Sequence, residues 1–130
     1  MKDKMTLLQF AALPAHRLAG HNTASTYVYE FGHVPPDKKD FPNYGAFHSS
    51  EVPFALQSLH TWQRPWRPID KTIEKMMSAY WVNFAKAGNP NATDLPRWQP
   101  YDHTDGHILK IGANTATKAG HLKAEFEFLD

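Results

Sequence analysis

One short stretch of the chain delivers a histidine after a small-residue turn, with a glutamate three residues further on. It reads Gly45-Ala46-Phe47-His48-Ser49-Ser50-Glu51. The imidazole of a histidine has an unperturbed pKa near neutrality, at about 6.5, so it can take a proton from a hydroxyl group and later return it to a leaving group. The stretch therefore points to general acid–base chemistry at His48.

Other candidates for chemistry have simpler interpretations. His103 and His107 have a spacing that occurs in metal sites, but Asp105-Gly106 between them predicts a solvated turn, so we expect no metal site there. Asn91-Ala92-Thr93 is a glycosylation sequon, which has meaning only if the chain is secreted. We expect the four tryptophans to pack in the core and its caps rather than to form a ligand surface. They are Trp62, Trp66, Trp81 and Trp98.

The composition excludes several classes of protein. The 130 residues suggest one domain spanning residues 1–130, and 42% hydrophobic residues are ordinary for a globular chain. A formal net charge of +1 and dispersed basic residues argue against a nucleic-acid partner. No apolar run approaches the ~18 residues that a membrane span needs. There is no cysteine, so neither disulfides nor thiol chemistry are expected, and the cellular compartment stays open.

The N-terminal part favours a helix over residues 4–19, with a kink at Pro14 and an end at Gly20. A cleaved signal peptide is the alternative, but Asp3 and Gln9 interrupt the required pattern. Residues 25–31 are rich in β-branched and aromatic side chains and predict a strand that ends at Gly32.

The histidine is expected on a loop. Prolines break residues 33–44, and Ser49 or Ser50 is expected to cap a short helix that runs to Ser58 and tolerates Pro53 only in its first turn. Residues 61–68 form a second proline-broken loop.

The strongest helical signal covers residues 71–87, with Asp70 as the expected N-cap and Gly88 as the stop. Its apolar positions form one helical face: Ile69, Ile73, Met76, Met77, Tyr80, Trp81 and Phe84. Beyond it, we expect an extended segment at 97–101, a short strand at 107–111 and an edge strand or amphipathic tail at 122–129. So few strands leave the one at 25–31 short of partners, which favours the last part of a larger sheet protein.

Four stretches of the chain, in order, resemble the type-B carboxylesterases, the family that includes the cholinesterases. They are the strand at 25–31, the histidine stretch at 45–54, the helix end with its stop at 80–91, and the extended segment at 95–101. The resemblance implies an α/β fold: the C-terminal fragment of an α/β-hydrolase, with helices and two or three short strands. It also implies that no cofactor or metal is needed.

The resemblance places His48 at the position of the family's catalytic histidine. Glu51 is a tempting triad acid, but in the α/β-hydrolase order the acid precedes the histidine. We therefore expect Glu51 to brace the histidine loop. The family's serine stands in a Gly-x-Ser-x-Gly elbow, and neither this pentapeptide nor a glycine-rich run for an oxyanion hole occurs here.

Two hypotheses follow. In the first, the chain is the C-terminal segment of a serine carboxylic-ester hydrolase, inactive alone, whose partner is the missing N-terminal portion and whose ester substrate binds only in the complete enzyme. In the second, it is a non-catalytic binding module that self-associates, for example as a homodimer pairing open strand edges.

Overall fold

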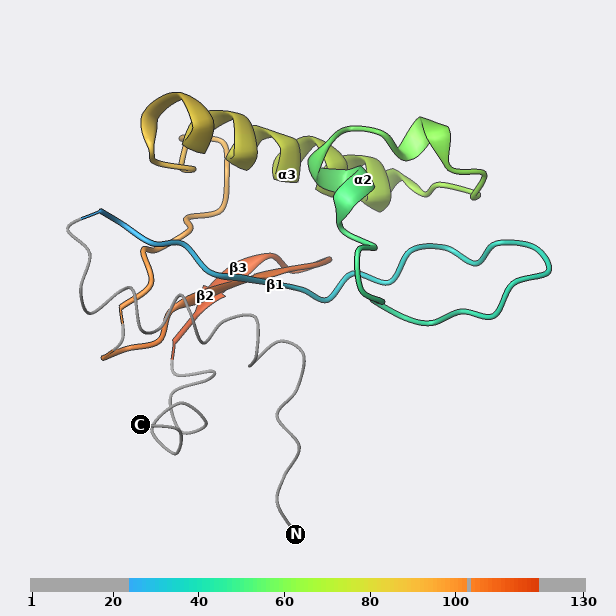
Figure 1. The fold of residues 1–130 in the computed structure, drawn as a ribbon, viewed down its shortest axis with the longest axis horizontal. Coiled ribbons are helices and arrows are strands. Elements are labelled where there is room, and N and C mark those ends of the chain that lie inside the picture. Colours follow the sequence, from blue (N-terminus) through green and yellow to red (C-terminus); the bar gives the residue numbers. More distant parts are fainter. Residues whose placement is uncertain (1–23, 103, 120–130) are drawn as a thin grey trace, which may run out of the picture. The chain divides into compact units, whose positions relative to one another are not determined.

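A computed structural model describes residues 24–102 and 104–119 (Figure 1). The helix expected at 4–19 and the segment expected at 122–129 lie outside these residues. The elements follow in the order β1 (Tyr29–Phe31), α2 (Val52–Ala55), the 3-10 helix η1 (Leu59–Thr61), α3 (Pro68–Ala87), β2 (Ile108–Ile111) and β3 (Ala116–Lys118). None of the described helices is long and apolar enough to cross a membrane.

The described residues form two compact units. The first contains residues 24–30, 97–102, 104–110 and 116–119. The second contains residues 31–96 and 111–115, and therefore holds α2, η1 and α3 together with the histidine stretch.

The strands form a three-stranded sheet in the order β1-β2-β3. Strands β2 and β3 are antiparallel, with Leu109 opposite Thr117. The predicted strand at 107–111 is confirmed within one residue, and it supplies the partner that β1 was expected to lack. The strand predicted at 25–31 is confirmed only at its end. Strand β3 was not predicted, because Ala-Thr-Lys is too short to show an alternating pattern.

The first unit is built around Trp98. Its indole Nε1 donates a hydrogen bond to the carbonyl of Val28 at 3.0 Å, and the rings of Tyr27 and Tyr29 meet it edge-on, with centroids 5.7 and 5.9 Å away. The segment that contains Trp98 forms neither helix nor strand, and Tyr101 N–H donates to the carbonyl of Thr26. The expectation that Trp98 packs in the core is confirmed.

Helix α3 dominates the second unit and begins three residues earlier than predicted. Arg67 is its N-cap, and Pro68 provides the first-turn conformation with a fixed φ. Asp70 is therefore not the N-cap but the third helical residue, and its carboxylate reaches back to accept the Arg67 backbone N–H at 2.6 Å. The predicted stop is confirmed, because Gly88 adopts a left-handed φ of 67°.

The apolar face of α3 is buried over its first part only. Ile73, Met77 and Tyr80 are fully buried, and the Tyr80 hydroxyl donates to the carbonyl of Pro96 at 2.5 Å. Phe84, the last apolar residue on this face, is 47% exposed. Helical spacing shows which residues share a face but not how far the neighbouring chain extends along it.

Candidate active-site histidine loop

His48 lies in an exposed turn that leads into α2. Ser50 N–H donates to the carbonyl of Phe47 at 3.0 Å, so His48 is the second and Ser49 the third residue of a four-residue turn. Ser49 has a φ of 69°, which is unusual for a residue other than glycine or asparagine. This conformation presents His48 to solvent at the tip of the turn.

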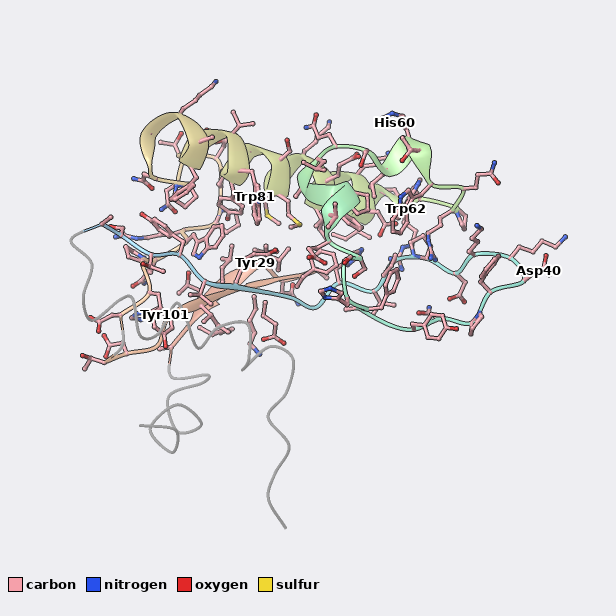
Figure 2. All side chains as sticks on the ribbon, in the orientation of Figure 1. Tyr29, Asp40, His60, Trp62, Trp81 and Tyr101 are labelled. Atoms are coloured by element: carbon pink, nitrogen blue, oxygen red, sulfur yellow. The ribbon has the colours of Figure 1, made fainter. Side chains whose placement is uncertain are left out.

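The residue before His48 is held by an aromatic stack. The ring of Phe47 lies parallel to that of Trp62, with centroids 6.5 Å apart and planes 9° apart. The Arg64 guanidinium lies 5.8 Å from the Trp62 ring, which Figure 2 labels, and donates to the carbonyl of Pro36 at 2.7 Å. Phe47 and Trp62 are half-buried, whereas the His48 side chain is exposed. The backbone next to the imidazole is therefore anchored while the ring stays accessible.

The residues after His48 are also anchored. Ser50 is 1% exposed, and Pro53 and Phe54 of α2 are buried. The prediction that Ser49 or Ser50 caps this helix is wrong, because Glu51 holds the N-cap position, without a side-chain hydrogen bond. The helix is also shorter than predicted, since it ends at Ala55 rather than at Ser58. The prediction that Pro53 falls in the first turn is confirmed.

Glu51 contributes to α2 through its backbone. Its carbonyl accepts the N–H groups of Phe54 and Ala55, each at 3.0 Å. Its side chain is half-buried and makes no hydrogen bond to the other described residues. Bracing of the loop by the Glu51 carboxylate stays a prediction.

The turn predicted at Asp105-Gly106 is present. Gly106 has a φ of 61°, and its N–H donates to the carbonyl of Asp102 at 2.6 Å. His103 lies outside the described residues. Over the described ranges, no group of three or more histidine, aspartate or glutamate side chains is arranged to hold a metal ion.

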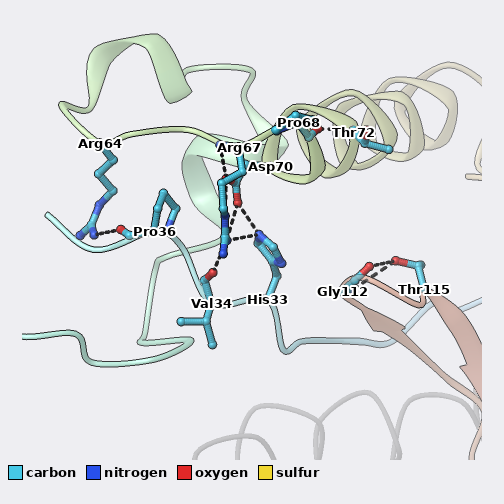
Figure 3. Close-up of polar contacts among 10 residues, drawn as sticks. All are labelled: His33, Val34, Pro36, Arg64, Arg67, Pro68, Asp70, Thr72, Gly112 and Thr115. Atoms are coloured by element: carbon cyan, nitrogen blue, oxygen red, sulfur yellow. Dashed lines mark hydrogen bonds and ion pairs between the residues drawn. The ribbon is translucent and has the colours of Figure 1, made fainter.

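A charged network, buried at His33 and Asp70 and exposed at Arg67, lies at the start of the segment that leads to His48, and sequence reasoning missed it. Figure 3 shows His33, Arg67 and Asp70 joined by hydrogen bonds. His33 Nε2 is 2.5 Å from Asp70 Oδ1, and Arg67 Nη2 is 2.9 Å from the same oxygen. His33 and Asp70 are 37 residues apart, so no local spacing signals their pairing.

The network determines which atoms carry protons. Burial raises the pKa of Asp70, but hydrogen bonds from Arg67 and His33 outweigh this effect and lower the pKa to about 2. The carboxylate is therefore ionised at neutral pH and can only accept. It follows that His33 Nε2 carries a hydrogen and donates to Asp70, and that Arg67 Nη2, 3.4 Å from Nε2, is a neighbouring donor rather than a partner.

His33 has the appearance of a second catalytic histidine, because a paired carboxylate is what a general base needs. Its surroundings argue against that role. The side chain is 8% exposed, and its ring meets Phe31 and Phe54 edge-on at 6.1 and 5.6 Å. The Nε2 atom is occupied by Asp70, so the ring has no free, accessible nitrogen on that side for a substrate. Among these two histidines, His48 is the one that solvent reaches.

The chain belongs to the carboxylesterase family, whose family model matches residues 3–129. It is 34% identical over 115 residues to the acylcarnitine hydrolase of Mus musculus, covering 84% of this chain and 20% of that protein. It is 38% identical over 104 residues to the bile salt-activated lipase of Homo sapiens, covering 77% of this chain and 14% of the lipase. The chain thus spans about a fifth or less of the length of these curated relatives.

The fold is that of the α/β-hydrolase esterases. The structure is similar to that of a carboxylesterase from Geobacillus stearothermophilus, with a TM-score of 0.67 and 25% sequence identity. The similarity covers 85% of this chain and 23% of that enzyme. The expected fold class, an α/β-hydrolase fragment with helices and a small number of short strands, is confirmed.

Proposed function

We propose that this chain is the histidine-bearing part of a serine carboxylic-ester hydrolase, in which His48 is the general base and then the general acid. The observation that carries the proposal is the accessible imidazole of His48 on a turn anchored at Phe47 and at Ser50. Membership of the carboxylesterase family supports an ester as the substrate class.

In the proposed reaction, a serine hydroxyl supplied from outside this chain attacks the ester carbonyl carbon while His48 takes its proton. The resulting imidazolium then gives that proton to the departing alcohol, which leaves an acyl-serine. Water attacks the acyl-serine with His48 again as the base, and the serine is released with its proton restored. The reaction needs no cofactor and no metal.

The partner that this proposal requires is the portion of the hydrolase that carries the serine elbow, the triad acid and the oxyanion donors. The sequence holds no Gly-x-Ser-x-Gly pentapeptide. The proposed place of this chain is therefore the C-terminal part of such an enzyme, with Glu51 bracing the histidine loop. Without preorganised donors, the tetrahedral intermediate would not be stabilised.

The first test is an assay of the 130-residue chain with p-nitrophenyl acetate. We expect no hydrolysis beyond that of free imidazole at the same concentration. Turnover of this ester that His48→Ala abolishes would show that the chain holds a complete site, and the proposal that it lacks one would be wrong.

The second test places this chain in the Geobacillus stearothermophilus carboxylesterase, in place of the segment that it matches. In this chimera, His48→Ala should lower kcat at least about a thousandfold, as loss of a triad member does. His60→Ala is the matched control, because His60 is an exposed histidine of the same unit, and it should change kcat less than about twofold. If the two substitutions lowered kcat equally, His48 would have no catalytic role.

A further inference from the structure

The irregular segment that presents His48 begins and ends at one place in the second unit. We define the histidine loop as residues 34–53, which begin at the third residue after β1 and include the first two residues of α2. The residues that flank it are in contact: the His33 and Phe54 rings meet at 5.6 Å, and the Phe31 and Phe54 rings at 5.2 Å. Phe54 is fully buried. The two ends of the loop are therefore in contact, and we call this contact of Phe31, His33 and Phe54 the neck of the loop.

The charged network fastens this neck to the start of α3. Asp70 Oδ2 accepts from the Arg67 backbone N–H at 2.6 Å and from Arg67 Nε at 3.0 Å, while Oδ1 accepts from His33 Nε2. Arg67 Nη2 also donates to the carbonyl of Val34 at 2.7 Å, the first residue of the loop (Figure 3). Charge-assisted bonds of this kind are shorter and stronger than neutral ones. The neck is therefore fixed from the side chain of His33 and from the backbone next to it.

We propose that His33, held by Asp70 and Arg67, is a positioning residue for His48. The loop contains little regular structure of its own, so the place of its turn depends on its anchors. One anchor is the stack of Phe47 on Trp62, and the other is the neck. A displacement of about 1 Å at a catalytic group can reduce a rate about a hundredfold, so an anchor that never touches substrate can still set kcat. This inference rests on the proposed function of His48.

The substitution that isolates the network is His33→Phe, which keeps a planar ring against Phe54 but removes the donor to Asp70. His33→Gln is the conservative variant, since its amide N–H₂ can restore a bond to the Asp70 carboxylate. Both are made in the full 130-residue chain, and amide hydrogen exchange is followed by NMR. The probes are the N–H groups of Ser50 and Ala55, which close the turn and α2, and those of Met77 and Tyr80 inside α3.

We expect His33→Phe to speed exchange at Ser50 and Ala55 by about tenfold or more, with less than about twofold change at Met77 and Tyr80. His33→Gln should recover most of the protection. Equal acceleration in the loop and in α3 would mean that His33 only stabilises the unit, and no acceleration at either place would mean that the neck does not hold the loop. Either result overturns the inference.

The chimera described above separates this inference from the proposed function. There His33→Phe should lower kcat about tenfold or more with KM changed less than about twofold, and His33→Gln should restore most of kcat. In a His48→Ala background, His33→Phe should lower kcat no further. If His48→Ala leaves kcat unchanged, the proposed function fails whatever the exchange data show. If His48→Ala abolishes kcat but His33→Phe lowers neither protection nor kcat, the positioning role alone is overturned.

Discussion

The two residues that follow His48 each have a feature that is costly by itself. Ser49 adopts a left-handed backbone, and the Oγ of Ser50 is buried with no hydrogen-bond partner among the described residues. A strained non-glycine residue costs about 1–3 kcal/mol and a buried unpaired hydroxyl about 1–3 kcal/mol. Such features persist where the surrounding contacts determine the backbone, as the anchors at Phe47 and Phe54 do here.

Ser50→Ala should raise the free energy of unfolding of the 130-residue chain by about 1 kcal/mol, because it removes a buried hydroxyl that lacks a partner. Urea unfolding at neutral pH measures the change. Ser58→Ala is the control at a half-buried serine of the same unit and should stay within about 0.5 kcal/mol of the parent chain. A clear loss of stability in Ser50→Ala would indicate that the hydroxyl has a partner.

Asp70 should make stability depend on pH in the acid range. Its pKa is about 2 in the folded chain and about 3.8 in an unfolded one, so the unfolded state takes up its proton first as the pH falls. The contribution, about 2 kcal/mol, is fully present above pH 4 and is lost as the pH falls from 4 through 2.

This pH dependence is tested by urea unfolding of the parent chain and of Asp70→Asn at pH 5 and pH 2.5. The variant should be less stable at pH 5, and the difference should shrink at pH 2.5 because the parent loses the benefit of the carboxylate. Asp94→Asn, at an exposed aspartate, is the matched control and should show no such convergence. A constant difference between parent and Asp70→Asn at both pH values would contradict the assignment.

Among the elements, α3 shows most clearly which structural features the local sequence pattern predicts. Its existence, its buried positions Ile73, Met77 and Tyr80, and its end at Gly88 follow from helical spacing and stop chemistry. Its start does not, because an aspartate near a helix start can serve as N-cap or reach back from the third helical position. Pro68 and the bond from the Arg67 N–H select the second arrangement.

Gly88→Ala should lower the free energy of unfolding by about 1 kcal/mol. The space around an added Cβ is open, so the loss comes from the left-handed φ of 67° alone. Gly112→Ala is the matched control, with equally open space and no positive φ, and it should change stability by less than about 0.5 kcal/mol. Thermal or urea unfolding of the two variants distinguishes them; equal losses would show that the conformation of Gly88 is not the cause.

For the whole molecule, the most informative quantity is the fraction of its relatives' length that the chain spans. The chain spans 20% of the mouse acylcarnitine hydrolase and 14% of the human lipase. On α3, Val82 and Phe84 are 45% and 47% exposed. Because residues two positions apart in a helix point to different sides, each of these side chains offers apolar area to solvent separately.

The double variant Val82→Ser with Phe84→Ser should therefore bind less of an apolar fluorescent dye than the parent chain. The reason is the smaller apolar area offered to solvent, and the measurement is dye fluorescence at equal protein concentration. Lys75→Ser, an exposed position of the same helix, is the control and should leave the fluorescence unchanged. Unchanged fluorescence in the double variant would show that this end of α3 is not the dye-binding surface.

The sequence by itself determined the family, the strong helix with its glycine stop, the proline-broken loops and the turn that carries His48. These features depend on residues close together in the chain, where spacing, capping and backbone preference act directly. Only the tertiary structure decided that β1 pairs with β2, that Phe47 stacks on Trp62 and that His33 donates to Asp70. Those contacts join residues far apart in sequence, and their energies come from burial and desolvated charge, which no local pattern records.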